Sequence, residues 1–181
     1  MAIQIMEAVQ KRLSLPPLVK ITPDGEVGAR DLPRAPFHQA ALVAVAAMLY
    51  KVTRTNEGCT HLLMSGRKDN WLDYDEAFGK RMPEVIEKIN SYGMADPLAT
   101  EQLMRKIADA CLLIMHEELA NNMSTDSVRD FMSGQRHNIL VYQPVDMQLG
   151  KLLNDSVWDD QTNHMEGPVS GFMHRIENLF S

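Results

Sequence analysis

The residues most suited to chemistry lie in the stretch IMHEELANNM, residues 114–123, where His116 precedes two glutamates. A histidine and carboxylates on one helix can supply metal ligands, but the zinc-protease pattern needs a second histidine four residues later. That position is Ala120, so this pattern is absent. A metal ion bound here would therefore need further ligands from elsewhere in the chain.

A helical wheel separates His116 from Glu118. With Cys111 at the centre of the apolar face, His116 falls about 140° away, whereas Glu118 falls only about 20° from the centre. A buried carboxylate must be paired or neutral, because its charge loses hydration. Three interpretations of Glu118 stay open: it is hydrated where the helix leaves the core, it forms a structural ion pair, or it is a catalytic or ligand carboxylate.

Residues 154–167 form the segment that is richest in oxygen and nitrogen ligands. A hydrated loop explains this composition without any chemistry. The alternative is a metal-dependent helical-bundle enzyme, with ligands drawn from His116, Glu118, Asp159 and His164. The sequence contains neither a glycine-rich phosphate loop nor a GxSxG motif. We therefore assign no catalytic residue and expect no cofactor.

The last predicted helix, residues 168–181, carries a regular apolar stripe. Its members are Val169, Phe172, Met173, Ile176 and Phe180. Such a stripe usually packs on the core of its own domain. If it is not packed there, it is a candidate partner surface of the helix-in-groove kind.

Composition narrows the classes of function. The net charge is −6, from 18 basic and 24 acidic side chains, which disfavours nucleic-acid binding through phosphates. The most apolar stretch, residues 40–50, is shorter than the roughly 20 residues of a membrane span. Cys59 and Cys111 are expected to be buried free thiols in a reducing compartment, so we expect a cytoplasmic protein. The 13 methionines are read mainly as core filler, with an adaptable binding surface as the alternative.

Apolar residues recur at helical spacing along most of the chain, which predicts a mostly α-helical, single-domain bundle of about six to seven helices. Residues 40–50 are apolar on nearly every side, so other helices should surround them. Gly58 is expected to end this helix, before a short helix up to Gly66. The other expected helices cover residues 2–14, 73–93, 97–121, 124–132, 146–158 and 168–181. Pro83 should kink the second of these or start a fresh helical turn, and Gly134 should end the helix at residues 124–132.

Two segments do not show helical spacing. Residues 14–36 hold five of the nine prolines, and we interpret them as a strap with room for a small β-hairpin near residues 18–28. The chain is accordingly divided into residues 1–36, the first helix and its strap, and residues 37–181, the helical domain. Residues 138–144, NILVYQP, are β-like and either pair with the hairpin or form an extended connector.

Residues 39–63, QAALVAVAAMLYKVTRTNEGCTHLL, resemble a segment of the YidB-like bacterial proteins, which are small helical proteins of unknown function. The shared pattern is an alanine-rich helix, a short polar break, and EG at the start of a second helix of small residues. The resemblance implies an all-helical fold and transfers no catalytic residue. The leading hypothesis is a non-enzymatic protein-interaction module that binds a protein partner or a second copy of itself. It rests on the lack of a recognisable catalytic constellation, the acidic composition, the many methionines and the amphipathic ends of the chain.

Overall fold

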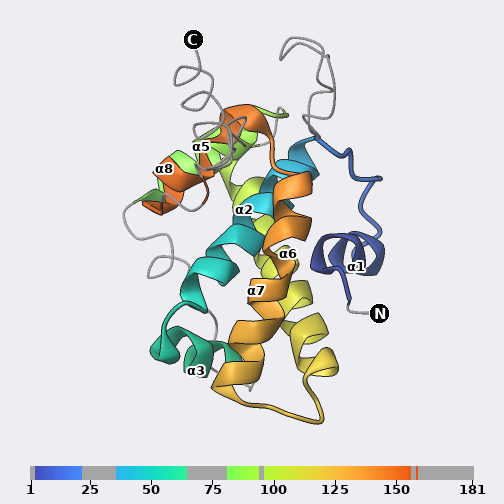
Figure 1. Ribbon diagram of the computed structural model, residues 1–181. Helices are drawn as coiled ribbons and strands as arrows, with labels where there is room; N and C mark the ends of the chain where they lie inside the picture. The colour runs from blue at the N-terminus through green and yellow to red at the C-terminus, as the bar shows by residue number, and fades with distance from the viewer. Residues whose placement is uncertain (1–2, 22–35, 65–80, 94–95, 156–157, 159–181) are drawn as a thin grey trace, which may run out of the picture.

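The computed structural model describes residues 3–21, 36–64, 81–93, 96–155 and 158. This part of the chain is mostly helical and contains no β-strand, which confirms the predicted all-α bundle (Figure 1). The helices are α1 (Ile5–Arg12), α2 (Phe37–Val52), α3 (Asn56–Met64), α5 (Met82–Asn90), α6 (Pro97–Glu118), α7 (Thr125–Val141) and α8 (Leu149–Leu153), with a 3-10 turn η2 (Val145–Met147) before α8. Within these described ranges, no helix is both long and apolar enough to cross a membrane.

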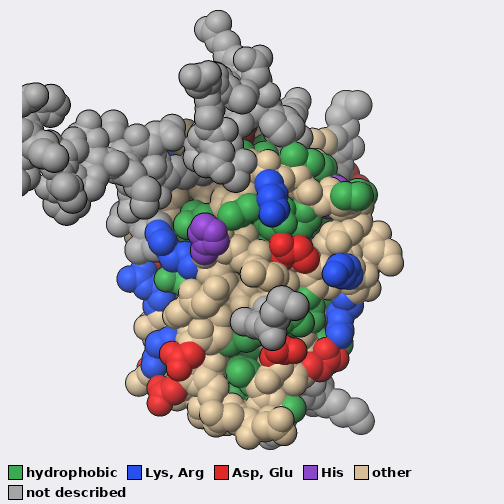
Figure 2. Space-filling model, turned by 45° about the vertical axis from the view of Figure 1, so that its right-hand side comes forward, with side chains coloured by type: hydrophobic (Ala, Val, Ile, Leu, Met, Phe, Trp, Pro, Cys, Tyr) green, Lys and Arg blue, Asp and Glu red, His purple; other side chains and the backbone are tan. Residues whose placement is uncertain are grey.

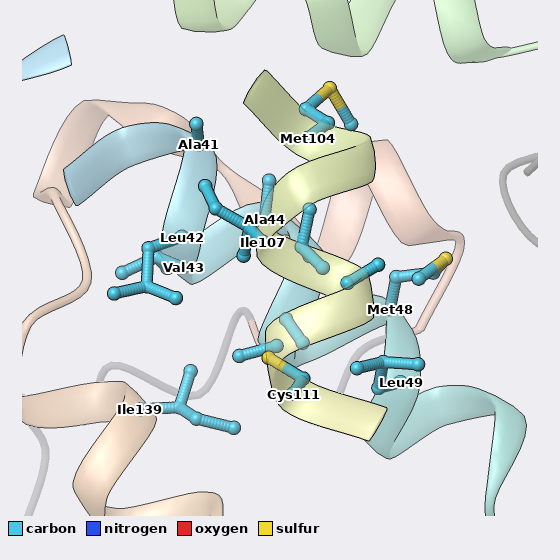
Figure 3. Packing of buried hydrophobic residues seen from close by; sticks show 14 of the residues in the cluster. Ala41, Leu42, Val43, Ala44, Met48, Leu49, Met104, Ile107, Cys111 and Ile139 are labelled. Carbon is cyan, nitrogen blue, oxygen red and sulfur yellow. The ribbon is translucent and has the colours of Figure 1, made fainter. Parts of the chain in front are cut away.

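Helix α2 occupies the centre of the bundle (Figure 1). Every residue from Gln39 to Leu49 is buried, and α2 packs against α1, α5, α6, α7 and α8. Figure 3 shows side chains of α2 and α6 interleaving, while Ile139 approaches from α7. Alanine at many of these positions lets neighbouring backbones come close, because its side chain is one methyl group. The predicted enclosure of this helix is confirmed.

The longest helix, α6, begins as its sequence predicts. The Asp96 carboxylate accepts hydrogen bonds from the backbone N–H groups of Leu98, at 2.9 Å, and Ala99, at 3.2 Å. Pro97 follows in the first turn, where its missing N–H costs no hydrogen bond. The face centred on Cys111 is buried as expected, and the helix ends at Glu118.

The predicted end of α7 at Gly134 is wrong, and so is the β-like assignment of residues 138–144. Helix α7 continues through Gly134 to Val141, and a turn follows. The reason is a pair of polar contacts between α7 and α1. Gln135 and Asn138, three residues apart on one helix face, are both buried and hydrogen-bond to the first turn of α1. Local apolar composition could not reveal this contact, because its partner lies about 130 residues earlier.

Helix α1 is capped by α7 and not by its own residues. Its N-cap, Gln4, makes no capping side-chain bond. Instead, Gln135 Oε1 accepts from the Ile5 N–H at 2.9 Å, and Asn138 Oδ1 accepts from the Met6 N–H at 3.1 Å. These bonds satisfy donors that every helix leaves unpaired at its start. The position of α1 is therefore fixed by specific polar contacts as well as by its apolar face.

Glu7 completes this polar cluster. Its carboxylate accepts from Asn138 Nδ2 at 2.9 Å and from the Tyr142 hydroxyl at 2.8 Å. Burial, together with the Glu7 carboxylate, raises the pKa of Tyr142 to about 12.

At the other end of α1, Arg12 makes a two-bond ion pair with Glu117 of α6.

The described part of the strap is held by Gln39. This fully buried amide accepts from the Val19 N–H at 2.7 Å and donates to the carbonyl oxygens of Val19, at 2.7 Å, and Tyr142, at 2.9 Å. The Ile21 N–H donates to the Val141 carbonyl at 2.8 Å. Residues 18–21 are extended beside the end of α7 but form no strand, and the rest of the proposed hairpin lies outside the described residues.

The predicted helix from Asp146 to Trp158 is broken into shorter pieces. Gln148 and Asn154 both have a φ of 50°, a left-handed conformation that limits α8 to Leu149–Leu153. The Asp146 carboxylate does not cap a helix with its side chain and accepts instead from the Tyr92 hydroxyl. Beyond α8, the fully buried Trp158 packs edge-on against Tyr50, with 5.0 Å between the ring centroids.

The sulfur-containing residues behave as core filler. Both cysteines are buried and free, as predicted. Seven of the nine described methionines are buried: Met6, Met48, Met82, Met104, Met115, Met132 and Met147. The exposed ones, Met64 and Met123, lie near the ends of α3 and α6.

The prediction that Gly58 ends α2 is wrong, because Gly58 lies inside α3. A Cβ atom at Gly58 would lie 1.9 Å from the carbonyl oxygen of Val52. Glycine is therefore required here for the close approach of α3 to the end of α2. At Gly134, by contrast, a Cβ atom would have no neighbour within 4 Å.

We expect Gly58→Ala to lower the free energy of unfolding by about 1–3 kcal/mol, because the backbone must shift to relieve the clash. The matched control, Gly134→Ala, should raise stability by about 0.5–1 kcal/mol, the usual gain in a helix interior. Urea unfolding followed by circular dichroism measures both. Equal effects of the two substitutions would contradict the close approach at Gly58.

The Tyr142–Glu7 contact predicts a loss of stability at high pH. Because the pKa of Tyr142 is raised in the folded state, folding favours the neutral phenol. This contribution is present below pH 10, its usual pKa, and is lost as the pH rises to about 12. Phenolate absorbance can be titrated by rapid mixing in the wild type and in Tyr142→Phe. The difference between the two curves should show one phenol transition near pH 12. A difference transition near pH 10 would contradict the buried contact.

Candidate functional site

The structure describes two of the four proposed metal ligands, His116 and Glu118. His116 is half-buried, and its Nε2 lies 2.9 Å from the carbonyl oxygen of Leu62. Glu118 is exposed in the last turn of α6, in agreement with the interpretation that the helix leaves the core there. Asp159 and His164 lie outside the described residues. Within the described ranges, no three His, Cys, Asp or Glu side chains are grouped closely enough to hold a metal ion.

The proposed partner surface of the last helix also lies outside the described residues. This applies to all five members of its stripe: Val169, Phe172, Met173, Ile176 and Phe180. Its role therefore stays a prediction.

The best candidate site among the described residues is a hollow of about 470 Å³ between α5 and the start of α6. Its volume is in the usual range for small binding pockets. The described lining is predominantly apolar side chains with two carboxylates and one amide: Met82, Pro83, Ile86, Glu87, Asn90, Pro97 and Glu101. We call this hollow the α5–α6 groove.

Helix α5 presents two apolar edges, and this creates the groove. Val85 and Ile89 face the core and are buried. Ile86 is only half-buried, and Met82 lies at the edge of the core with 8% of its surface exposed. Pro83 stands in the first turn of α5, as predicted, and is exposed. The apolar arc of α5 is thus wider than the core can cover, and its outer edge forms the groove floor.

The far end of α5 is attached to two neighbouring helices. Thr100 of α6 donates a hydrogen bond from its hydroxyl to Asn90 Oδ1 at the end of α5. Gly93, just beyond α5, lies against Phe37 at the start of α2, and a Cβ atom there would be 2.8 Å from Phe37 Cβ. The first contact therefore holds the end of α5 against α6 beside the groove, and the second holds the residues after α5 against α2.

The charged side chains in the described groove lining are acidic. Glu87 is exposed on α5, and Glu101 is half-buried on α6. Glu101 pairs with Arg105 one turn along α6 at 2.6 Å. Such a surface pair contributes little to stability, about 0.3–0.5 kcal/mol, so a ligand cation can replace it at small cost. On the face drawn in Figure 2, acidic and basic side chains are interspersed and hydrophobic side chains are exposed between them.

A second hollow, of about 310 Å³, lies on the other side of α5, between that helix and α8. Its lining is more polar and includes the two lysines Lys88 and Lys151. Glu87 borders both hollows. Helix α5 is therefore a ridge with an apolar, acidic groove on one side and a polar hollow of mixed charge on the other.

Sequence reasoning missed the α5–α6 groove. Its signals were available in part: the Pro83 and Pro97 helix starts, and Ile86 next to the buried positions of α5. The sequence did not show which edge of the α5 stripe the core would leave uncovered. That depends on how α2 and α6 pack against α5.

Comparison of the chain with family models, with curated proteins and with solved structures found no match. The resemblance of residues 39–63 to YidB-like proteins therefore stays a prediction.

Proposed function

We propose that the protein is an interaction module that binds an amphipathic helical segment in the α5–α6 groove. The observation that carries the proposal is the combination of an apolar floor with acidic side chains in the lining. A groove of this kind suits the helix-in-groove mode, in which apolar side chains one turn apart anchor the ligand. The described lining offers apolar surface for the anchors of such a segment and carboxylates for a basic side chain beside them.

The ligand chemistry follows from the lining. Met82, Ile86 and the two prolines favour aliphatic or aromatic anchors, and methionine adapts to differently shaped side chains. Glu87 and Glu101 favour a lysine or arginine at the border of the ligand's apolar face. We therefore expect the partner segment to carry an apolar stripe flanked by a basic residue.

The two buried free thiols, Cys59 and Cys111, support placing this module in a reducing compartment such as the cytoplasm.

The first experiment measures binding of a short amphipathic peptide with leucines at helical spacing and arginine at the border of its apolar face. Calorimetric titration of the full chain should detect binding, and Ile86→Asp should weaken it at least about tenfold, a cost of about 1.4 kcal/mol. The matched control is Leu113→Asp, because Leu113 is 50% exposed on α6 but does not line the groove. Absence of binding, or equal loss in both variants, would overturn the proposal.

Charge reversal gives a second, independent readout. Glu87→Lys should weaken the arginine peptide and strengthen the same peptide with glutamate in that position. Because Glu87 is exposed, the thermal unfolding midpoint should change little. Unchanged preference between the two peptides would show that the carboxylate plays no part in recognition.

A further inference from the structure

Helix α1 is held against the bundle by residues that lie far from it in sequence. It lies at the side of the bundle and packs against α2, α6 and α7 (Figure 1). We call the surface that receives it the α1 seat. The seat is marked by the side chains that hydrogen-bond to α1: Glu117 on α6, Gln135 and Asn138 on α7, and Tyr142 at the end of α7. A second copy of the chain offers the same seat, so α1 can make the same contacts there.

A strained junction joins α1 to the strap. Ser14, which follows the helix closely, has a φ of 52°, in the left-handed region. Its N–H donates to the Lys11 carbonyl at 3.2 Å, and the Leu15 N–H donates to the Gln10 carbonyl at 2.9 Å, which is the Schellman arrangement that ends many helices. Glycine is favoured at the left-handed position because it has no Cβ atom. With serine there, the closed junction carries strain that an extended junction would not.

The strap beyond the junction is attached separately. The Pro16 carbonyl lies 3.1 Å from His38 Nε2, and Val19 is hydrogen-bonded through both its N–H and its carbonyl to the Gln39 amide. These anchors lie at the start of α2 and do not belong to the α1 seat. Only residues 13–15 lie between the two sets of contacts. A change of conformation confined to these residues therefore moves α1 as a unit and leaves the strap in place.

We infer that two copies of the chain exchange α1 through this junction, so that each α1 docks in the α1 seat of the other copy. The exchange keeps the contacts of α1 and replaces the left-handed Ser14 with extended backbone in both chains. Short hinges under strain favour domain swapping for this reason. The hydrogen bonds that Ser14 and Leu15 lose lie at the end of the helix, where Ser14 is exposed and water can replace them.

The length of the junction sets the arrangement of the dimer. Three extended residues span about 10 Å, so the seat of the other copy must lie directly beside the junction. The two junctions then pass each other close to a two-fold axis. Docking within one chain competes, because a helix on so short a tether has an effective concentration in the millimolar range. Since strain is relieved twice in each dimer, the balance between monomer and dimer should respond steeply to residue 14.

Substitutions at Ser14 change the junction without touching the α1 seat, because this side chain is exposed. Ser14→Gly removes the strain of the closed form and should raise the dimer dissociation constant at least about tenfold relative to the wild type. Ser14→Pro should lower it at least about tenfold, because the ring fixes φ at about −65° and removes the N–H. Sedimentation equilibrium of the full chain, from micromolar to millimolar concentrations, measures all three. Ser14→Val, which keeps the N–H but disfavours a positive φ, replaces Ser14→Pro if the latter does not fold.

Cross-linking identifies the exchanged helix itself. Arg12 of α1 pairs with Glu117 of the seat, so a short bis-maleimide should bridge cysteines at these two positions when the helix is docked. Full chains carrying Arg12→Cys alone are mixed with full chains carrying Glu117→Cys alone, so only exchange between copies brings the two cysteines together. The natural cysteines are 0% and 1% exposed and should not react. The mixed link, identified by mass spectrometry of the joined peptides, should form fastest with Ser14→Pro added to both chains and slowest with Ser14→Gly.

The two measurements must agree. Dimer formation and the mixed link that both increase from Ser14→Gly through the wild type to Ser14→Pro would support the inference. A Ser14→Pro or Ser14→Val chain that stays monomeric, a dimer that forms without the mixed link, or equal behaviour of Ser14→Gly and Ser14→Pro would overturn it. The proposed function is tested separately, because the peptide experiments at Ile86 do not involve α1.

Discussion

Burial of α2 on all sides is the constraint on which the rest of the structure depends. Eleven consecutive residues, Gln39–Leu49, are withdrawn from water, so every neighbouring helix must turn an apolar face towards them. Only one of the eleven side chains is strongly polar. Gln39 uses both ends of its amide to hold the strap and the end of α7, so burial there costs no unpaired group.

The groove follows from the same constraint. Helix α5 must face α2 and α6 with Val85 and Ile89, and its base is fixed by the Asn90–Thr100 hydrogen bond and the close contact of Gly93 with Phe37. Ile86, which follows Val85 on the neighbouring edge of α5, stays half-buried and lines the groove beside Met82. This apolar surface, bordered by Glu87 and Glu101, is the one that we propose binds a helical ligand.

Features set by nearby residues could be predicted from the sequence. The Asp96–Pro97 start of α6, the enclosed alanine-rich helix and the apolar side of α1 each depend on patterns within one or two turns. Features set by distant partners could not. Asn138 was placed at the start of a β-like run because of the apolar residues that follow it. The contact that keeps it in a helix, with the N-terminus of α1, is far away in sequence and could not be seen there. Gly58 resembled a helix stop, although it is required by the carbonyl of Val52. The groove was missed for the same reason, since only packing decides which edge of α5 stays uncovered.

Native-state hydrogen exchange resolved by residue is the most direct test of the enclosure of α2. If α2 is surrounded as described, its amides from Ala41 to Leu49 should exchange only through global unfolding, with protection equal to the full free energy of unfolding. The amides of the short outer helix α8 should exchange sooner, through local opening. Exchange of the α2 amides at the rate of those in α8 would contradict the account.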